Sequence, residues 1–196
     1  MEDIFPRAEG IDYTQLQITE EGSYSITRRR DAEHIIHIIK NAVPDCAEKN
    51  ITDTTACIGG DTLNFARAFK EVHSIELNSL NFEVLKNNVK VYGYTNVFLH
   101  HGDCTELYTW ASDVLYIDPP WGGPNYRTIQ NLNLFLGKFR LDEWLDDVLS
   151  GPYRPSHVFL KVPLNYNTKP LQFLTNIRTI TSYRIRTYML VHITVQ

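Results

Sequence analysis

Three acidic residues stand at or near the ends of successive strand-like segments: Asp53 in ITDTT, Glu76 in VHSIEL and Asp103 in LHHGDC. Glu76 could accept both ribose hydroxyl hydrogens and Asp103 an adenine amine. Asp53, inside a strand, needs a donor such as an ammonium group. The glycine turn ACIGGDT, residues 56–62, opens a helix whose free N–H groups can face a ligand. It has neither GxGxxG nor P-loop spacing. Together these features favour S-adenosylmethionine, with S-adenosylhomocysteine as product.

The stretch DPPWGGPNY, residues 118–126, follows the apolar run VLYI and predicts a rigid loop at the carboxyl end of a buried strand. A methyl donor gives this loop a chemical purpose. The exocyclic amine of a nucleobase is a poor nucleophile because its lone pair is delocalised into the ring. The Asp118 carboxylate and the Pro119 carbonyl could hold its two N–H bonds, while Trp121 stacks on the base.

The elements that position these residues follow from the apolar pattern. Helical spacing predicts a helix over 31–43 with Asp31 as its N-cap, and a second helix that ends at Gly93. Strand-like and helical runs then alternate, and residues 177–195 predict a closing pair of strands. This order predicts an α/β fold with a mainly parallel sheet, in which ligands bind beyond the carboxyl ends of the strands.

The bulk composition is that of an ordinary globular protein: 196 residues, 43% hydrophobic, net charge −4. The beginning MEDIFPRAEG lacks the apolar core of a signal peptide, and no run approaches the ~20 apolar residues of a membrane span. Three cysteines without metal-ligand spacing argue against a zinc site or disulfides, so we expect no metal and an intracellular protein.

The net charge argues against a broad nucleic-acid clamp. However, residues 151–196 hold six Lys or Arg and no acidic residue, and RRR occupies 28–30. A local phosphate-binding face, including Lys161 and Lys169, is therefore a hypothesis.

The chain resembles the trimethylguanosine synthase family, class I methyltransferases that modify the guanine 2-amino group of 7-methylguanosine RNA caps. The similarity covers most of residues 18–126, and PPWGGPNY is its most specific part. The matching segments are EEGSYSITRRRDAEHI (20–35), the cofactor loop DTTACIGGDTLNFA (53–66), NNVKVYG (87–93), GD (102–103) and the signature loop PPWGGPNY (119–126).

The resemblance implies a class I methyltransferase (Rossmann-like) fold. This is a seven-stranded, mostly parallel sheet with helices on both faces and a closing antiparallel strand. Residues 1–45 would form an N-terminal extension and helix that pack on the core (46–196) and complete the substrate site. Trp121 would stack on the cationic cap guanine. Catalytic roles fall to Asp118, Pro119 and Trp121. Cofactor contacts are expected from Thr27, Asp53, Ala56, Gly59, Thr62, Glu76, Leu77, Asp103, Cys104 and Asp118. Substrate contacts are expected from Tyr24, Trp121, Gly122, Asn125, Tyr126, Lys161 and Asn165.

Three positions depart from the family pattern. Asp118 stands where Ser usually precedes PPW, Cys57 where the cofactor loop has Gly, and Leu164 where Arg is common. Aspartate is the residue of adenine-6-amino methyltransferases, so an RNA or DNA enzyme of that DPPW type is one alternative. A non-catalytic binding module with a methyltransferase fold is another. We expect a monomer that acts on capped RNA in the nucleus or cytoplasm, without a membrane or stable protein partner, which would also suit a viral protein in its host cell.

Overall fold

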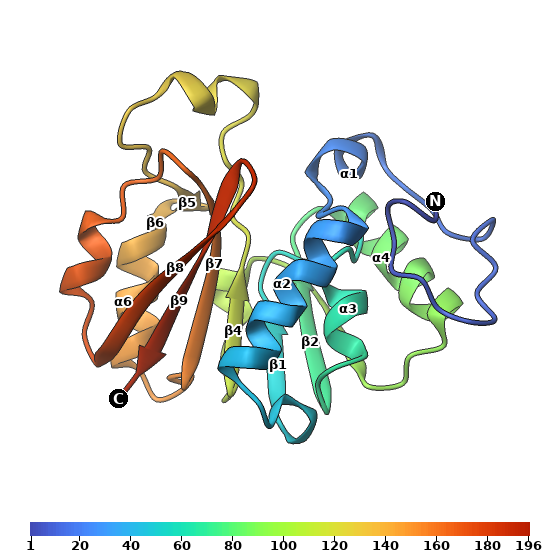
Figure 1. Ribbon diagram of the computed structural model, residues 1–196, viewed down its shortest axis with the longest axis horizontal. Helices are drawn as coiled ribbons and strands as arrows, with labels where there is room; N and C mark the ends of the chain where they lie inside the picture. Colours follow the sequence, from blue (N-terminus) through green and yellow to red (C-terminus); the bar gives the residue numbers. More distant parts are fainter. The chain divides into compact units, whose positions relative to one another are not determined.

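The computed structural model describes the whole chain except the Pro124 side chain, and the chain divides into two compact units, Met1–Leu107 and Tyr108–Gln196. Both units combine strands with helices (Figure 1). The first contains α1 (Glu20–Ser25), α2 (Arg29–Ala42), η1 (Cys46–Glu48), β1 (Asn50–Asp53), α3 (Thr62–Ala66), β2 (Glu71–Glu76), α4 (Ser79–Tyr92), β3 (Val97–His101) and α5 (Cys104–Leu107). The second contains β4 (Val114–Ile117), η2 (Pro124–Thr128), β5 (Phe135–Leu136), β6 (Phe139–Arg140), α6 (Leu141–Ser150), β7 (His157–Pro163), η3 (Lys169–Phe173), β8 (Ile177–Ile185) and β9 (Tyr188–Val195).

The strands of the first unit are parallel and lie in the order β3-β2-β1. Helix α3 packs on β2, and α2 packs beside α3 (Figure 1). Helix α2 forms because Ile35, Ile38 and Ile39 recur at helical spacing, and all three are buried. Phe5 and Leu16 of the N-terminal segment join a core with residues of α3 and α4. This packing holds the loop after β1 between the N-terminal segment and α4.

The strands of the second unit lie in the order β4-β7-β9-β8. Strands β4 and β7 are parallel, whereas β9 is antiparallel to both β7 and β8. All four residues of β4 are fully buried, as expected for an interior strand of a parallel sheet. In α6, Leu141, Leu145 and Leu149 recur every four residues and are also fully buried.

The strand register of the second unit places chemically important side chains next to each other. Ile117 of β4 pairs with Leu160 of β7, so the next residues, Asp118 and Lys161, lie side by side. At the other side of β7, Pro163 pairs with Tyr188 at the start of β9.

The principal strands and the longer helices occur where the sequence predicts them, including the pair β8–β9 and the end of α4 at Gly93, which has φ 67°. One predicted cap is wrong. Helix α2 begins at Arg29 with Arg28 at the N-cap, so Asp31 lies in the first turn, where its charge still favours the helix dipole. The seven principal strands agree with the predicted mostly parallel sheet that includes an antiparallel strand.

Candidate functional site

The loop between β1 and α3 is shaped by backbone conformations that favour glycine. Gly59 has φ 101°, and Cys57 has φ 50°. A Cβ atom on Gly60 would lie 2.6 Å from the Thr27 carbonyl oxygen and from Ile26 Cγ1, so a larger residue does not fit there. The positive φ of Cys57 gives a physical reason for the glycine that resembling loops have at this position. A cysteine in this conformation costs about 1 kcal/mol.

Glu76, at the end of β2, is bonded to this loop. Its Oε2 accepts a hydrogen bond from the Cys57 amide and its Oε1 one from the Asn78 amide, each at 2.7 Å. Burial raises the pKa of Glu76, and the two backbone donors offset part of that rise. Each carboxylate oxygen has a second lone pair that can accept a ribose hydroxyl. Leu77, the next residue, is 64% exposed and offers an apolar surface beside the carboxylate. This set of groups fits the predicted ribose and adenine contacts.

Asp53 and Thr62 are less accessible than a ligand contact requires. Their exposures are 1% and 0%. Thr62 donates to Asp53 Oδ2 at 2.7 Å, and its hydroxyl lies 2.9 Å from Ser74 Oγ. These bonds connect β1, β2 and the start of α3 beneath the cofactor loop. Both residues thus hold the loop in place, and their direct contact with a cofactor stays a prediction.

Asp103 follows β3 and caps the short helix α5. Its Oδ1 accepts hydrogen bonds from the Thr105 amide at 2.8 Å and from the Thr105 hydroxyl at 2.7 Å. This geometry fixes an acceptor where the sequence predicts a contact with an adenine amine. Burial raises the pKa of the Cys104 thiol to about 12, so this residue does not serve as a nucleophile at neutral pH.

Thr27 joins the N-terminal segment to the cofactor loop. Its hydroxyl donates to Asp61 Oδ2 at 2.5 Å, and both residues are buried. Sequence reasoning missed Asp61, although an acid directly after the glycine pair was the available signal. Ala56 is buried, with its amide bonded to the Ile75 carbonyl at 2.9 Å. Tyr24 is 75% exposed on α1 and so presents most of its surface to solvent.

In the second unit, Asp118 and Lys161 form a buried ion pair. Lys161 Nζ lies 2.6 Å from Asp118 Oδ2, and the two side chains are 7% and 17% exposed. Burial raises the pKa of the Asp118 carboxyl, while the Lys161 ammonium offsets part of the rise. The prediction that Lys161 belongs to a basic surface is wrong, because its charge is buried against Asp118. Any contact of Lys161 with substrate stays a prediction.

Trp121 is the centre of an aromatic cluster that also contains Tyr126 and Tyr188. Its ring centroid lies 5.3 Å from that of Tyr126, at an interplanar angle of 75°, and 6.1 Å from that of Tyr188. Lys161 Nζ lies 5.6 Å from the Trp121 ring and 5.3 Å from the Tyr188 ring. The indole N–H of Trp121 is buried and lowers the pKa of the Asp118 carboxyl, although the two groups do not reach hydrogen-bond geometry. Sequence reasoning missed Tyr188, which only the strand register brings to this position.

The loop that carries Trp121 has an unusual backbone. Gly122 and Gly123 have φ 88° and 73°, conformations that a residue with a side chain rarely adopts. Pro119 before Trp121 is buried, whereas Asn125 is exposed. The tryptophan is therefore held by a loop whose shape depends on its glycines and prolines, as the sequence predicts.

Asn165, after β7, holds the far part of this loop. Its side-chain amide donates to the carbonyl oxygens of Tyr126 and Ile129, each at 2.7 Å. The backbone carbonyl oxygen of Asn165 accepts a hydrogen bond from the Leu132 amide at 2.9 Å. Both side-chain N–H groups are thus engaged within the protein. Asn165 positions the loop, and its direct contact with substrate stays a prediction.

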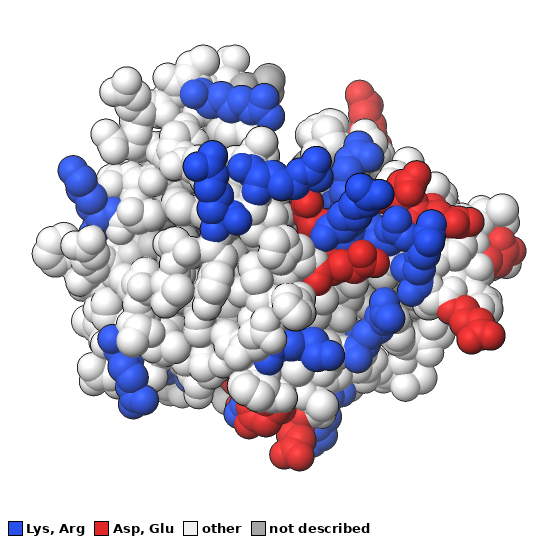
Figure 2. All heavy atoms as spheres, viewed as in Figure 1, with Lys and Arg blue, Asp and Glu red and all other residues white. Residues whose placement is uncertain are grey.

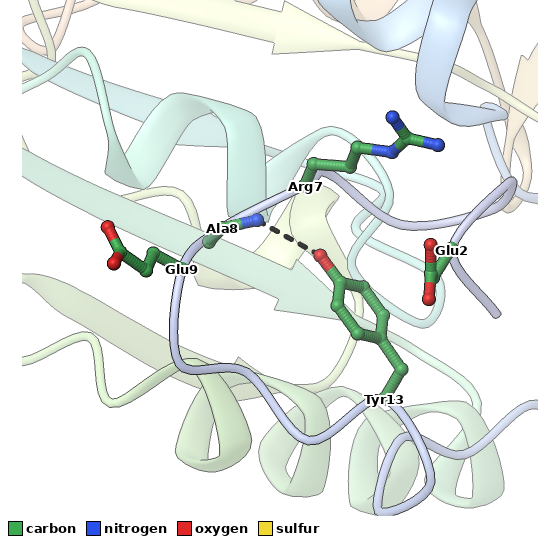
Figure 3. A pocket seen from close by; sticks show the side chains of 5 residues that line it. All are labelled: Glu2, Arg7, Ala8, Glu9 and Tyr13. Carbon is green, nitrogen blue, oxygen red and sulfur yellow. Dashed lines mark hydrogen bonds between the residues drawn. The ribbon is translucent and has the colours of Figure 1, made fainter.

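A hollow of about 460 Å³ lies in the N-terminal segment (Figure 3). It is lined by Glu2, Arg7, Ala8, Glu9 and Tyr13, and the Tyr13 hydroxyl accepts the Ala8 amide at 3.0 Å. None of these is a predicted site residue.

Among the residues that the structure describes, no cluster of three or more His, Cys, Asp or Glu could hold a metal ion. Within the same residues, no helix is long and apolar enough to cross a membrane.

The fold is that of a class I methyltransferase. A structural relative is an N2 methyltransferase of 16S rRNA from T. thermophilus, solved in complex with AdoMet and guanosine. It has a TM-score of 0.67 and 14% identity, and the match covers 84% of this chain and 43% of that one. The predicted fold class, that of S-adenosylmethionine-dependent methyltransferases, is confirmed.

The chain belongs to the RNA cap guanine-N2 methyltransferase family, whose model matches residues 48–192. A protein of Acanthamoeba polyphaga mimivirus is 32% identical over 188 residues, 84% of this chain and 73% of the relative. The trimethylguanosine synthase of Schizosaccharomyces pombe is 31% identical over 120 residues, which is 56% of this chain and 48% of that enzyme. The chain thus matches about half the length of the yeast enzyme.

Proposed function

We propose that this protein transfers a methyl group from S-adenosylmethionine to the exocyclic 2-amino group of 7-methylguanosine in RNA caps, giving di- or trimethylguanosine caps. The observation that carries the proposal is the position of Asp118 next to Trp121 at the end of β4. An aromatic ring for a base and a carboxylate for its amine are thereby held by one rigid loop. Membership of the RNA cap guanine-N2 family supports this reading of the loop.

The first unit supplies the groups for the cofactor in this proposal. Glu76 accepts the ribose hydroxyls, Leu77 contacts the adenine ring, and Asp103 accepts the adenine amine. Asp53 and Thr62 hold the loop that faces the methionine part. When bound, S-adenosylmethionine supplies an electrophilic methyl group on a sulfonium.

The second unit supplies the groups for the base. The Asp118 carboxylate and the Pro119 carbonyl accept the two N–H bonds of the amine, so that its lone pair is directed away from the ring. Trp121 stacks on the base, and the positive charge of 7-methylguanine strengthens this contact by roughly 0.5–2 kcal/mol. The amine nitrogen would gain the methyl group, S-adenosylhomocysteine would be left as the other product, and the nitrogen would release one proton to solvent.

The RNA substrate makes the nucleus or the cytoplasm the expected place of action, and a monomer is sufficient for the reaction. The mimivirus relative is consistent with a viral enzyme that works in a host cell.

One observation favours a second candidate. Asp118 directly before PPW is the pattern of adenine-6-amino methyltransferases, whose target amine needs the same acceptors. A competition between bases therefore decides the function.

The experiment is mass spectrometry of the products formed from S-adenosylmethionine and a 7-methylguanosine cap analogue, with the unmethylated cap and an uncapped adenosine-containing RNA as parallel substrates. We expect one or two methyl groups on the 7-methylguanosine cap alone. Methylation of adenine instead would establish the second candidate. Cofactor binding without transfer to any of the three substrates would identify a non-catalytic module.

A further inference from the structure

Strand β8 is the outer strand of its sheet and has a long free edge. It lies last in the order β4-β7-β9-β8, so within the described part of the chain β9 is the only strand that pairs with it. The strand runs from Ile177 to Ile185, and most of its residues are β-branched or aromatic, which favours extended backbone. Natural sheets usually shorten, bend or cover such an edge, because its backbone groups can pair with another chain.

The register of the β8–β9 hairpin determines which backbone groups face outward. Ile185 pairs with Tyr188 across a two-residue turn, so these two residues exchange backbone hydrogen bonds. Hydrogen-bonded and non-hydrogen-bonded residues alternate along an antiparallel pair. The N–H and C=O groups of Ile180, Ser182 and Arg184 therefore point away from β9. Within the residues that the structure describes, these outward groups have no hydrogen-bond partner.

Both faces of β8 are open in its middle. Thr181 and Ser182 are neighbours whose side chains point to opposite faces of the sheet, and both are exposed. Thr179 is exposed as well, whereas Ile180 and Tyr183 are half-buried. An extended peptide can thus approach this edge without displacing side chains that cover it.

The regular part of the edge has a defined length. A β-bulge between Ile177 and Thr179 interrupts the register at one end, and the turn after Ile185 ends the strand at the other. Residues 179–185 between them span about 23 Å at about 3.3 Å per residue. Each outward-facing residue in this window offers one donor and one acceptor to an added strand of similar length.

The charge at this edge is positive at both ends. Arg178 lies in the bulge and Arg184 near the turn, and both are exposed. Neither arginine forms an ion pair within the described residues, and residues 151–196 contain no acidic residue. Figure 2, in the same view as Figure 1, shows Lys or Arg side chains near both ends of β8 and no Asp or Glu side chain along it.

This charge distinguishes between two kinds of strand that could pair with the edge. Antiparallel pairing with a second copy about the central residue, Thr181, would place Arg178 of each copy opposite Arg184 of the other. Like charges directly opposite each other destabilise a strand pair. A strand with acidic side chains at matching positions would instead place a carboxylate opposite each arginine. The edge is therefore better suited to an acidic strand than to a second copy of β8.

We propose that the free edge of β8 binds an extended, acidic segment of a protein partner, which adds a further antiparallel strand to the sheet. Backbone hydrogen bonds to Ile180, Ser182 and Arg184 give the affinity, and carboxylates opposite Arg178 and Arg184 give the specificity. The inference goes beyond the proposed function and does not depend on it, because β8 carries none of the residues assigned to the cofactor or the base.

The test uses two fluorescent peptides of about ten alternating Thr and Val residues. Two positions with the spacing of Arg178 and Arg184 are both Glu in one peptide and both Lys in the other. Binding to the full chain is measured by fluorescence anisotropy. The variant Ser182→Pro removes an outward N–H, a change that an edge strand tolerates. The charge variant combines Arg178→Glu with Arg184→Glu, and its matched control combines Arg154→Glu with Lys138→Glu at exposed positions outside β8.

We expect the unmodified protein to bind the Glu peptide and not the Lys peptide. The charge variant should bind the Glu peptide about 10-fold more weakly and should gain affinity for the Lys peptide, whereas the matched control should behave like the unmodified protein. Ser182→Pro should bind neither peptide while it keeps a cooperative thermal transition. On binding of the Glu peptide, hydrogen exchange of the outward-facing Ser182 amide should slow, whereas that of Thr181, which faces β9, should change little.

Four results would overturn the inference. The first is no binding of the Glu peptide, and the second is an equal loss in the matched control, which would indicate a general effect of net charge. The third is binding that survives Ser182→Pro in a folded protein or leaves exchange at Ser182 unchanged, because no strand is then added. The fourth is a dimer in sedimentation that Ser182→Pro abolishes, which would assign the edge to a second copy. If Ser182→Pro does not fold, the charge variant and the exchange at Ser182 decide.

Discussion

Replacing Lys161 with methionine should destabilise the protein in a way that depends on pH. The substitution keeps a long side chain but removes the ammonium that lies 2.6 Å from Asp118 Oδ2. Removal of one partner from a buried ion pair costs about 3–5 kcal/mol, because the other charge is left buried without compensation. Asp118 is 17% exposed, so we expect the lower end, about 3 kcal/mol. For a chain of this length that corresponds to a fall in Tm of roughly 6–12 °C near neutral pH.

The pH dependence follows from the direction of the Asp118 shift. Its pKa in the folded protein is raised above the ordinary 3.8 by burial, and Lys161 offsets part of that rise. Without Lys161 the pKa rises further. A carboxyl with a raised folded pKa stabilises the protein below its unfolded pKa, and this contribution is lost as pH rises through the folded pKa. The difference in stability between the variant and the unmodified protein should therefore be largest at pH 8 and should shrink in acid.

The assay is thermal unfolding followed by circular dichroism at pH 8 and at the lowest pH where the unmodified protein remains folded. Combining Lys161→Met with Asp118→Asn provides the control, because it removes both charges and keeps the shapes. The double variant should recover most of the lost stability. Equal Tm values for Lys161→Met and the unmodified protein at pH 8, or a deficit that grows in acid, would refute the reasoning.

Three further predictions concern single residues. Glu76→Ala should weaken S-adenosylmethionine binding by roughly 2–3 kcal/mol in calorimetry, whereas Glu71→Ala at the other end of β2 should not; unchanged affinity in a folded Glu76→Ala protein would reject the ribose contact. Trp121→Ala should reduce cap-analogue affinity far more than Trp121→Phe, with cofactor affinity unchanged in both; a fully active Trp121→Ala enzyme would make the tryptophan purely structural. Asn165→Ala should raise KM for the cap and expose the neighbouring loop to proteases, because two carbonyl groups lose their donor; Asn133→Ala is the control, and equal protease resistance in the two variants would contradict this role.

Much of the fold could be predicted because periodic apolar residues dominate it. The spacing of Ile35 and Ile39 determines α2, and the continuous apolar run before Asp118 determines β4. The short helix α1 has no such pattern, since only Gly22 is buried among its six residues. The β5–β6 hairpin did carry a signal, the alternation of Leu132, Leu134 and Leu136 before a glycine, but its strands are two residues long.

The contacts within the site were harder to predict, because they join residues that are distant in sequence. Asp118 and Lys161 are separated by 43 positions. One clue was present, because a lysine inside the apolar run HVFLKVP must find a partner when the strand is buried. The same argument drew attention to Asp53, and its partner, the Thr62 hydroxyl, is nearby in sequence. No local pattern indicates that Tyr188 meets Trp121, since this depends on the order of β7 and β9.

The ion pair also changes the interpretation of Asp118, which stands where the resembling family usually has serine. An isolated carboxylate about 4 Å from a charged group interacts with it by about 4 kcal/mol at an effective dielectric constant near 20. An ammonium about 3 Å beyond the carboxylate cancels about 2.4 kcal/mol of that energy, which leaves less than half. Asp118 with Lys161 is thus electrostatically closer to a polar acceptor, such as the serine of the resembling family, than to a free anion. The aspartate alone is therefore weak evidence for adenine as the target base. Asp118→Ser by itself would leave the Lys161 ammonium without this carboxylate, so serine can replace aspartate without a loss of stability only when Lys161 is replaced as well.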